Sequence, residues 1–411
     1  MKKDRVVVTG LGVVSPIGIG IDAFWDAACR GVNGIAPITS FDTSGFRTAV
    51  GGEVKGFSPG EYLSPKQIAS MGRSSQLASA AALMALADAG LDTSKQDPYR
   101  LGVSLGTTMG EPQILEKGIE MIYEAKGSTD TMPDSLPAQY PCGAISAHVA
   151  ETIGACGPAI MIPTACAAGN YAIGYAFDLL STGMADIVVA GGSDPFSKIA
   201  FTGFNRLLAT AKEACRPFDK NRDGMCVGEG AGILALESLT HAKARAARIY
   251  AEVLGYGLGC DAFKMTIPDP SGSGGILALR RALDNARVPL DAVDYISAHG
   301  TGTEENDKTE TLIIKTVFGE KAKSIPVSSI KSMIGHTMGA ASAIEAVACA
   351  LTINRGVILP TINYSTPDPE CDLDYVPNTA RKALVNVAVS NAYAFGGNNS
   401  TLVLGRFGGW A

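Results

Sequence analysis

The sequence has little charge, few histidines and no long apolar segment. Only 18% of its 411 residues are charged and four are histidine. Forty acidic residues against 34 basic ones give a net charge of −6, which excludes the broad positive field that nucleic-acid binding needs. The best candidate for a membrane span, residues 334–353, contains His336 and Glu345, so no span is expected. The start, MKKDRVVVTGLG, lacks the apolar stretch of a signal peptide.

The cysteines show no paired pattern. Nine are present, an odd number, with no C-x-x-C spacing, at positions 29, 142, 156, 166, 215, 226, 260, 349 and 371. This excludes a disulfide framework and a standard zinc site, so we expect no metal and a reducing, cytoplasmic location.

Phosphate-binding glycine loops are also missing. No G-x-x-x-x-G-K-[ST] motif is present. Gly10 and Gly12 follow a predicted strand, but Ser15 stands where a dinucleotide fingerprint has its third glycine. We therefore interpret this segment as a tight turn between a strand and a loop.

What the sequence does have is a series of apolar β-branched runs that end in glycine-rich turns and lead into alanine-rich helices. Continuous apolar strands are typical of sheets covered on both faces, and alanine-rich segments such as 76–91 and 339–353 are typical of closely packed, buried helices. The pattern predicts a multilayered α/β protein.

The two halves of the chain have similar outlines. Each contains a buried strand, a Gly- and Ala-rich helix start and a later strand with a glycine pair. No Pro-rich linker separates them. We predict an internal duplication of residues 1–250 and 251–411, with both halves sharing one core.

Cys166 differs from the other cysteines in its setting. A strand-like run, AIMI, leads through Pro163 and Thr164 to Cys166, and an Ala/Gly-rich helix follows. The N–H groups and the dipole of a helix N-terminus lower a thiol pKa and can hold an oxyanion. We predict that Cys166 is a nucleophile and that the other eight cysteines are packing residues.

Two of the four histidines have a matching setting. His299, in AHGTGTEENDKTE, and His336, in SSIKSMIGHTMGAASAIE, each lie beside glycine where a predicted strand passes into a helix. Neutral imidazoles there can donate hydrogen bonds to a thioester carbonyl and stabilise an enolate. Near the C-terminus, Phe395 precedes Gly396 and Gly397, which permit close backbone approach.

These motifs, in this order, resemble those of a β-ketoacyl-acyl carrier protein synthase of the thiolase superfamily. The resemblance rests on TACAAG, HGTGT, KSMIGH and AFGGNN, extends to CRPFDKNRDGMCVGEGAG, and covers almost the whole chain. The two-histidine pattern is similar to elongating synthases of the KAS II type and to the ketosynthase subunit of type II polyketide systems. The resemblance implies a thiolase-like five-layer αβαβα fold made of two similar halves.

The resemblance also implies a decarboxylative Claisen condensation. Cys166 would carry the acyl chain as a thioester, and His299 and His336 would polarise a malonyl thioester as carbon dioxide leaves. The N–H groups of Cys166 and Phe395 would form the oxyanion hole. Phe395 would also gate the site. The carrier protein's phosphopantetheine arm would serve in place of any cofactor.

Further residues match family positions with supporting roles. Lys331 and Glu345 match a polar pair near the histidines, and Thr301 and Thr303 match positions that bind the pantetheine arm. Met109 matches a residue of the acyl pocket. Because the acyl carrier protein is acidic, a local basic patch is expected, with Arg206 and Lys66 as candidates and Arg73 and Lys212 as weaker ones.

Some positions depart from the fatty-acid pattern. AFGGNN stands where GFGGTN is usual, Met109 replaces a branched aliphatic residue, and Lys264 replaces a frequent histidine. The pathway, fatty acid or polyketide and polyene, therefore stays open, as do the chain length and the choice between a homodimer and a heterodimer with a related chain length factor.

Three other kinds of protein with a related sequence differ from a condensing enzyme at identifiable positions. A non-catalytic partner subunit that sets chain length would lack the cysteine. A coenzyme A-dependent thiolase would have a second cysteine in the C-terminal loop, and a malonyl decarboxylase would have glutamine in place of Cys166.

Overall fold

The computed structural model describes residues 4–409, so the extreme ends of the two predicted halves, 1–3 and 410–411, lie outside the described residues. The strands are β1 (Val6–Ser15), β2 (Gly18–Ile19), β3 (Ala36–Pro37), β4 (Val50–Gly51), β5 (Leu101–Gly106), β6 (Ala159–Ile162), β7 (Ile187–Asp194), β8 (Gly230–Ser238), β9 (Ala251–Cys260), β10 (Tyr295–Ser297), β11 (Val327–Ser328), β12 (Val357–Ile358), β13 (Arg381–Lys382), β14 (Val387–Tyr393) and β15 (Asn398–Gly405).

The α-helices are α1 (Ile21–Cys29), α2 (Pro65–Ser70), α3 (Arg73–Asp88), α4 (Pro112–Glu124), α5 (Ser135–Gln139), α6 (Gly143–Ile153), α7 (Ala168–Ser181), α8 (Lys198–Arg206), α9 (Leu239–Ala244), α10 (Ser273–Ala286), α11 (Glu304–Phe318), α12 (Lys331–Ile334) and α13 (Ala341–Arg355). Three short 3₁₀ turns matter for the site: η4 (Ala165–Ala167), η7 (Met338–Ala340) and η8 (Phe395–Gly397).

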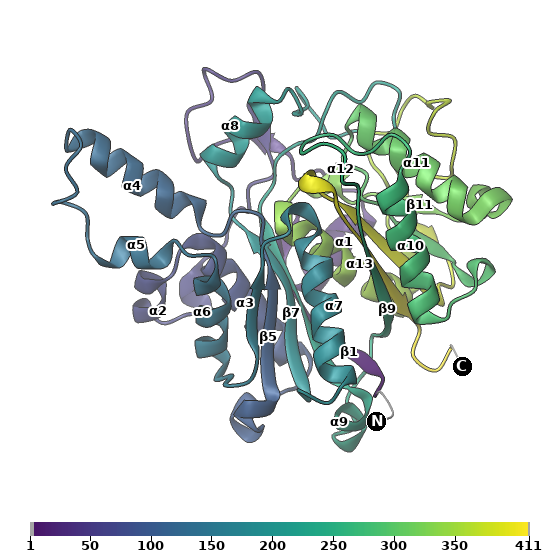
Figure 1. Cartoon of the computed structure of the whole chain (residues 1–411), viewed down its shortest axis with the longest axis horizontal. Coiled ribbons are helices and arrows are strands. Elements are labelled where there is room, and N and C mark those ends of the chain that lie inside the picture. Colours follow the sequence, from purple (N-terminus) through teal and green to yellow (C-terminus); the bar gives the residue numbers. More distant parts are fainter. Residues whose placement is uncertain (1–3, 410–411) are drawn as a thin grey trace.

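The main sheet has 11 strands, of which ten form two five-stranded parts and β2 pairs with β1. Their order is β11-β10-β14-β15-β9 for the second half and β1-β8-β7-β5-β6 for the first (Figure 1). They join only where β1 pairs with β9 over three residues, Val6–Val8, so most of each part faces the other across a layer of helices.

The two parts have the same topology. In the first, β7 is parallel to β5 and antiparallel to β8, and β5 is parallel to β6. In the second, β14, β10, β15 and β11 repeat these relations in the same order. By this match α7, which follows β6, corresponds to α13, which follows β11. The repeated topology is what an internal duplication produces.

Helices fill three layers around the two parts of the sheet. In the middle, α7 and α13 contact each other and strands of both halves. Residues 341–353 of α13 are buried on every side, which explains their small side chains. Outside, α3 and α6 cover the first half and α10 and α11 cover the second (Figure 1). This is the five-layer arrangement expected of a thiolase-like fold.

The prediction of a turn at Gly10 and Gly12 is wrong. β1 runs through both residues to Ser15. A Cβ atom at Gly10 would lie 2.1 Å from the carbonyl oxygen of Ala85, and one at Gly12 would lie 1.9 Å from that of Ala81. The glycines therefore permit α3 to pack directly on the strand, which is a close-approach role and not a turn.

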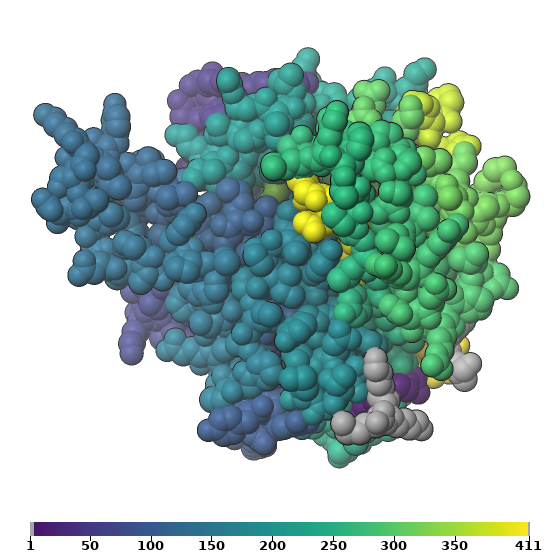
Figure 2. All heavy atoms as spheres, in the orientation of Figure 1, coloured from purple at the N-terminus to yellow at the C-terminus, as the bar shows by residue number. Residues whose placement is uncertain are grey.

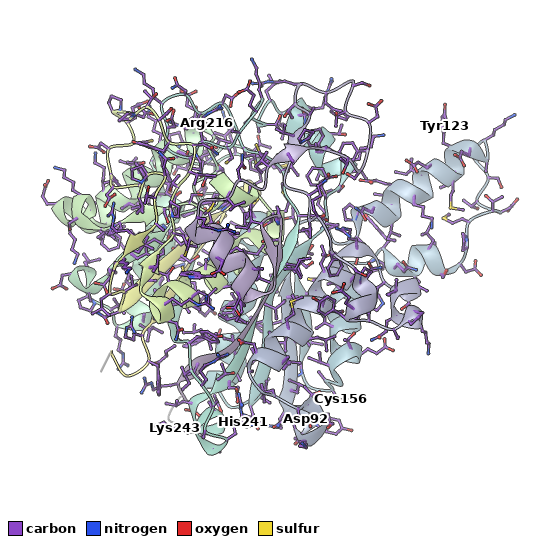
Figure 3. All side chains as sticks on the ribbon, turned by 180° about the vertical axis from the view of Figure 1, so that it is seen from behind. Asp92, Tyr123, Cys156, Arg216, His241 and Lys243 are labelled. Atoms are coloured by element: carbon purple, nitrogen blue, oxygen red, sulfur yellow. The ribbon has the colours of Figure 1, made fainter. Side chains whose placement is uncertain are left out.

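A hairpin of α4 and α5 projects from the body of the first half (Figure 1). Tyr123, on α4, is 85% exposed and lies far out on this projection (Figure 3). Across residues 4–409, no helix has both the length and the apolar character to span a bilayer.

Candidate active site

Cys166 lies on a strained turn between β6 and α7. The turn η4 carries it, and Ala165 just before it has φ +51°, a left-handed conformation that is unfavourable for a residue with a Cβ atom. The helix α7 starts two residues later, at Ala168. The side chain is 6% exposed. The predicted placement at a helix start is confirmed.

The predicted lowering of the thiol pKa is wrong for this structure. Burial raises the pKa of Cys166 to about 11, and the charge of Asp194 adds to this rise. Lys331 and the backbone N–H groups of Phe395 and of Cys166 itself oppose it by favouring a negative sulfur. Desolvation outweighs these contacts, so the resting thiol is protonated at neutral pH.

His299 follows β10, and hydrogen bonds to Glu310 and Lys331 hold it in place. Its backbone N–H and that of Gly300 donate to the two carboxylate oxygens of Glu310, at 2.9 and 2.8 Å. Its Nδ1 lies 3.4 Å from Nζ of Lys331. Because an ammonium group only donates, Nδ1 must accept, which leaves the proton on Nε2. Burial lowers the pKa of His299 well below 6.5, with help from the Lys331 charge and from His336.

His336 has the same tautomer for a different reason. The backbone N–H of Met338 donates to its Nδ1 at 3.2 Å, so Nε2 again carries the proton. Its own backbone N–H donates to the carbonyl oxygen of Cys226 at 2.7 Å. Burial and the Lys331 charge lower the pKa of His336 well below 6.5. The rings of His299 and His336 are 5.3 Å apart and nearly perpendicular, so the site has two neutral imidazole donors side by side.

Lys331 and Glu345 form an ion pair beneath the histidines, with side chains 0% and 1% exposed. Burial raises the pKa of Glu345 to about 7 against the opposing effect of Lys331. The structure therefore brings together the two residues that the resemblance paired, and it places the lysine directly behind His299.

The turn η8 covers the thiol from the C-terminal side. Gly396 and Gly397 have φ +81° and +75°, which glycine alone adopts without strain. The N–H of Gly396 donates to the carbonyl oxygen of Met265 at 2.7 Å, so the turn is tied to the loop after β9. The ring of Phe395 lies 5.6 Å from that of Phe204. These contacts keep the N–H of Phe395 directed at Cys166.

A cavity of about 320 Å³ joins these groups. Cys166, His299, His336 and Phe395 line it. Thr301 and Thr303 also line it, and their hydroxyl oxygens are 2.9 Å apart. In Figure 2 a hollow lies between the teal and green parts of the surface, and yellow atoms of the C-terminal segment are visible in it. Of the cysteines in the described chain, Cys166 alone lines the cavity.

The remaining predicted residues lie further out. Met109 is half-buried and is not part of the cavity lining. Arg206 is exposed at the end of α8, two residues from Phe204 and from Leu208, which do line the cavity. Lys66 is exposed on α2, away from the lining, and Lys264 lines the entrance.

The other two histidines lie elsewhere. His148 Nδ1 is 3.0 Å from the hydroxyl of Ser75, and His241 Nδ1 is 2.5 Å from the Glu237 carboxylate. Arg216 lies beside the site, since its backbone nitrogen would be 3.2 Å from a Cβ atom at Gly302. His241 lies at the opposite end of the molecule from Arg216 (Figure 3). In residues 4–409 no three His, Cys, Asp or Glu side chains converge as metal ligands.

The sequence interpretation missed two buried carboxylates, Glu310 and Asp194. Glu310, held between α11 and the His299 turn, is fully buried and has a pKa raised by that burial to about 7. Asp194 is the last residue of β7 and is 1% exposed. An acidic residue at the end of a strand of apolar and small residues, IVVAGGSD, is the one signal that could have singled out Asp194.

Comparison with known proteins identifies the class that this fold and site define. Residues 3–242 match the family model "Beta-ketoacyl synthase, N-terminal domain", and residues 250–365 match "Beta-ketoacyl synthase, C-terminal domain". The chain belongs to the β-ketoacyl synthase family.

Individual relatives match along their whole length. The chain is 42% identical over 409 residues to 3-oxoacyl-[acyl-carrier-protein] synthase 2 of Staphylococcus aureus, covering 98% of each. It is 43% identical over 415 residues to the tetracenomycin polyketide synthase ketoacyl synthase alpha subunit of Streptomyces glaucescens, covering 98% of this chain and 97% of the relative.

Solved ketosynthase structures are also similar to the chain over almost its whole length. The ishigamide ketosynthase/chain length factor has 44% identity and a TM-score of 0.94, with 98% of this chain and 99% of that chain covered. A type II polyketide acyl-carrier protein in complex with its ketosynthase gives 36% identity and a TM-score of 0.91 at the same coverage.

Proposed function

We propose that this protein is a β-ketoacyl-acyl carrier protein synthase that condenses an acyl chain on Cys166 with malonyl-acyl carrier protein. One observation carries the proposal: a single buried cavity holds the thiol, two N–H groups directed at it and two neutral imidazoles with their Nε2 protons available.

The first half-reaction loads the chain. The Cys166 sulfur attacks the acyl thioester of the carrier, the carbon–sulfur bond to the carrier arm breaks, and the arm leaves as a thiol after taking up the cysteine's proton. The tetrahedral oxyanion lies between the N–H groups of Cys166 and Phe395. Burial keeps the resting thiol protonated. The two N–H donors and the Lys331 charge therefore stabilise negative charge only as it develops during the attack.

The second half-reaction extends the chain. The malonyl thioester oxygen accepts hydrogen bonds from His299 and His336 as the bond to the carboxylate breaks and carbon dioxide leaves. The resulting enolate carbon attacks the acyl-Cys166 carbonyl, and the bond to sulfur breaks to give 3-ketoacyl-carrier and the Cys166 thiolate. The thiolate takes up a proton from water and returns to the resting thiol. Neutral imidazoles suit this step, since they donate a proton in a hydrogen bond without adding a buried charge.

Binding of the substrate arm falls to the cavity entrance. Thr301 and Thr303 present hydroxyls for the amides of a phosphopantetheine arm, and the arm belongs to the carrier, so no further cofactor is needed. Arg206 and Lys66 would contact the acidic carrier, and Met109 would limit the acyl chain. We place the enzyme in the cytoplasm, as a homodimer or paired with a related chain length factor.

Two variants separate the half-reactions. Cys166→Ala should abolish acyl transfer and leave malonyl decarboxylation in place, whereas His299→Ala should lower decarboxylation by roughly 100-fold, because one of two oxyanion donors is lost. Intact-mass analysis after incubation with acyl carriers of graded length reads the first step and the substrate range, and carbon dioxide release reads the second. Acylation of any other cysteine would contradict the assignment.

The same experiment tests the alternatives. A non-catalytic chain-length-setting subunit would show no acylation of the wild-type chain, and a coenzyme A-dependent thiolase would prefer acetyl-coenzyme A to a malonyl carrier.

A further inference from the structure

Asp194 is a buried carboxylate that accepts hydrogen bonds from two separate segments, one of which is the turn after His336. The hydroxyl of Thr107 and the N–H of Met109 donate to Oδ1 at 2.8 and 3.2 Å. The N–H groups of Thr108 and Gly339 donate to Oδ2 at 2.7 and 2.6 Å. No ion pair in the described part of the chain involves Asp194, so these four donors alone balance its buried charge.

The donors come from two segments that are far apart in the sequence. Residues 107–109 follow β5 and carry Met109, the predicted acyl-pocket residue. Gly339 belongs to η7, the turn between His336 and α13. A Cβ atom at Gly339 would lie 2.6 Å from Asp194 Oδ2 and 2.6 Å from Thr107 Cα, so the two segments meet on the carboxylate with no room between them.

The contact to Gly339 fixes its neighbour Met338. Met338 has φ +54°, a conformation that is costly for a residue with a side chain and persists only where its surroundings hold it. Its N–H is the group that donates to Nδ1 of His336. A turn that relaxed from this conformation would remove that donor and leave the tautomer of His336 unfixed.

We propose that Asp194 is a positioning residue: by accepting from Gly339 it holds the Met338–Gly339 turn so that His336 keeps its proton on Nε2, facing the substrate. The same carboxylate also accepts hydrogen bonds from the 107–109 segment, which does not line the cavity. This inference rests on the proposed function for its catalytic consequence, but the tautomer of His336 does not depend on any substrate.

Three variants test it. Asp194→Ala removes both acceptor oxygens and leaves all four donors without this partner. Asp194→Asn can turn its amide nitrogen toward the Thr107 hydroxyl, which can then accept, so the amide oxygen still accepts from Thr108 and Gly339. In this orientation only the N–H of Met109 loses its acceptor. Thr107→Val is the matched control. It removes one donor to the carboxylate and the acceptor of the Gly110 N–H, and it leaves the Gly339 contact intact.

The first readout is chemical. We expect Asp194→Ala to lower malonyl decarboxylation by roughly 100-fold, the size seen when one oxyanion donor is lost, while acyl loading of Cys166 stays within about threefold. Asp194→Asn should recover most of the decarboxylation, and Thr107→Val should match the wild type. An equal loss of loading and decarboxylation in Asp194→Ala, or a decarboxylation rate like that of the wild type, would overturn the proposal.

The second readout is spectroscopic and serves if Asp194→Ala folds poorly. Imidazole ¹⁵N shifts should report protonated Nε2 at His336 in the wild type, Asp194→Asn and Thr107→Val, and a mixture of tautomers in Asp194→Ala, with His299 unchanged. If Asp194→Ala is not recovered folded, a Nδ1-protonated His336 in the wild type or a tautomer mixture in Asp194→Asn refutes the proposal. A wild type that neither loads nor decarboxylates would defeat the proposed function instead, leaving the tautomer result to stand separately.

Discussion

At the scale of single residues, burial has opposite consequences for the thiol and for the imidazoles. It raises the pKa of Cys166 to about 11 and lowers the pKa values of His299 and His336 well below 6.5. Desolvation disfavours whichever form is charged, so all three groups are neutral at rest. A neutral resting site keeps both imidazoles as donors and leaves Cys166 to become negative only when N–H groups are in place to receive the charge.

The neutrality of the histidines is open to direct titration. Since burial lowers their pKa values, both rings should stay neutral as pH falls from 8 to 6.5 and take up protons only further below 6.5. The measurement is an NMR titration of ring signals in Cys166→Ala, with each histidine assigned by its disappearance in His299→Ala or His336→Ala. A titration midpoint at or above 6.5 for either ring would contradict the structure.

At the scale of elements, three short turns between regular elements position Cys166, His336 and Phe395. η4 carries Cys166, η7 supports His336 and η8 directs the N–H of Phe395, and each has a residue with positive φ in or beside it. The η8 turn is held by the hydrogen bond of Gly396 to the loop after β9, and the η7 turn by that of Gly339 to the buried carboxylate of Asp194.

Gly396→Ala should weaken the η8 turn. An alanine at φ +81° costs about 1 kcal/mol, which should lower the free energy of unfolding by that amount and slow acyl transfer to Cys166, because the N–H of Phe395 moves away from the sulfur. Urea unfolding and the rate of acylation by intact mass measure the two effects.

Gly203→Ala is the matched control for this turn. Gly203 lies inside α8 beside Phe204, and a Cβ atom there meets nothing within 4 Å. The alanine should raise stability by about 0.5–1 kcal/mol and leave acylation unchanged. Acylation of Gly396→Ala at the wild-type rate would argue against a gating role for η8.

At the scale of the whole molecule, the protein has a net charge of −6, and its proposed partner, the acyl carrier protein, is acidic as well. Productive binding then depends on local positive charge near the cavity, because like charges elsewhere repel the carrier. Arg206 is placed for this, exposed at the end of α8 and next to residues of the lining.

Arg206→Glu should therefore raise the KM for malonyl-acyl carrier protein about tenfold at low salt, with kcat nearly unchanged and the difference shrinking as salt screens the charges. The matched variant Lys66→Glu, on α2, should give a smaller rise if the docking surface extends that far. Steady-state kinetics at two salt concentrations provide the comparison. An unchanged KM for Arg206→Glu would remove this residue from the docking surface.

Features that depend only on neighbouring residues could be predicted from the amino-acid sequence. The apolar runs and alanine-rich segments determine the strands and the buried helices. Cys166, His299 and His336 stand out because each lies in a short motif that contains glycine, although His336 follows the short helix α12 and not the predicted strand. The repeat of the two halves was also visible, since both copies keep the same order of signals along the chain.

Which residues far apart in the sequence come into contact could be learned only from the three-dimensional structure. Glu310 and Asp194 are two among 40 acidic residues, and their importance comes from N–H groups on other elements that no local pattern reveals. The thiol pKa went against the local prediction, because desolvation depends on everything packed around Cys166 and the helix start is only one part of it. Tautomers, cavity shape and charge balance are properties of three-dimensional contact, so they follow from the fold and not from the order of residues alone.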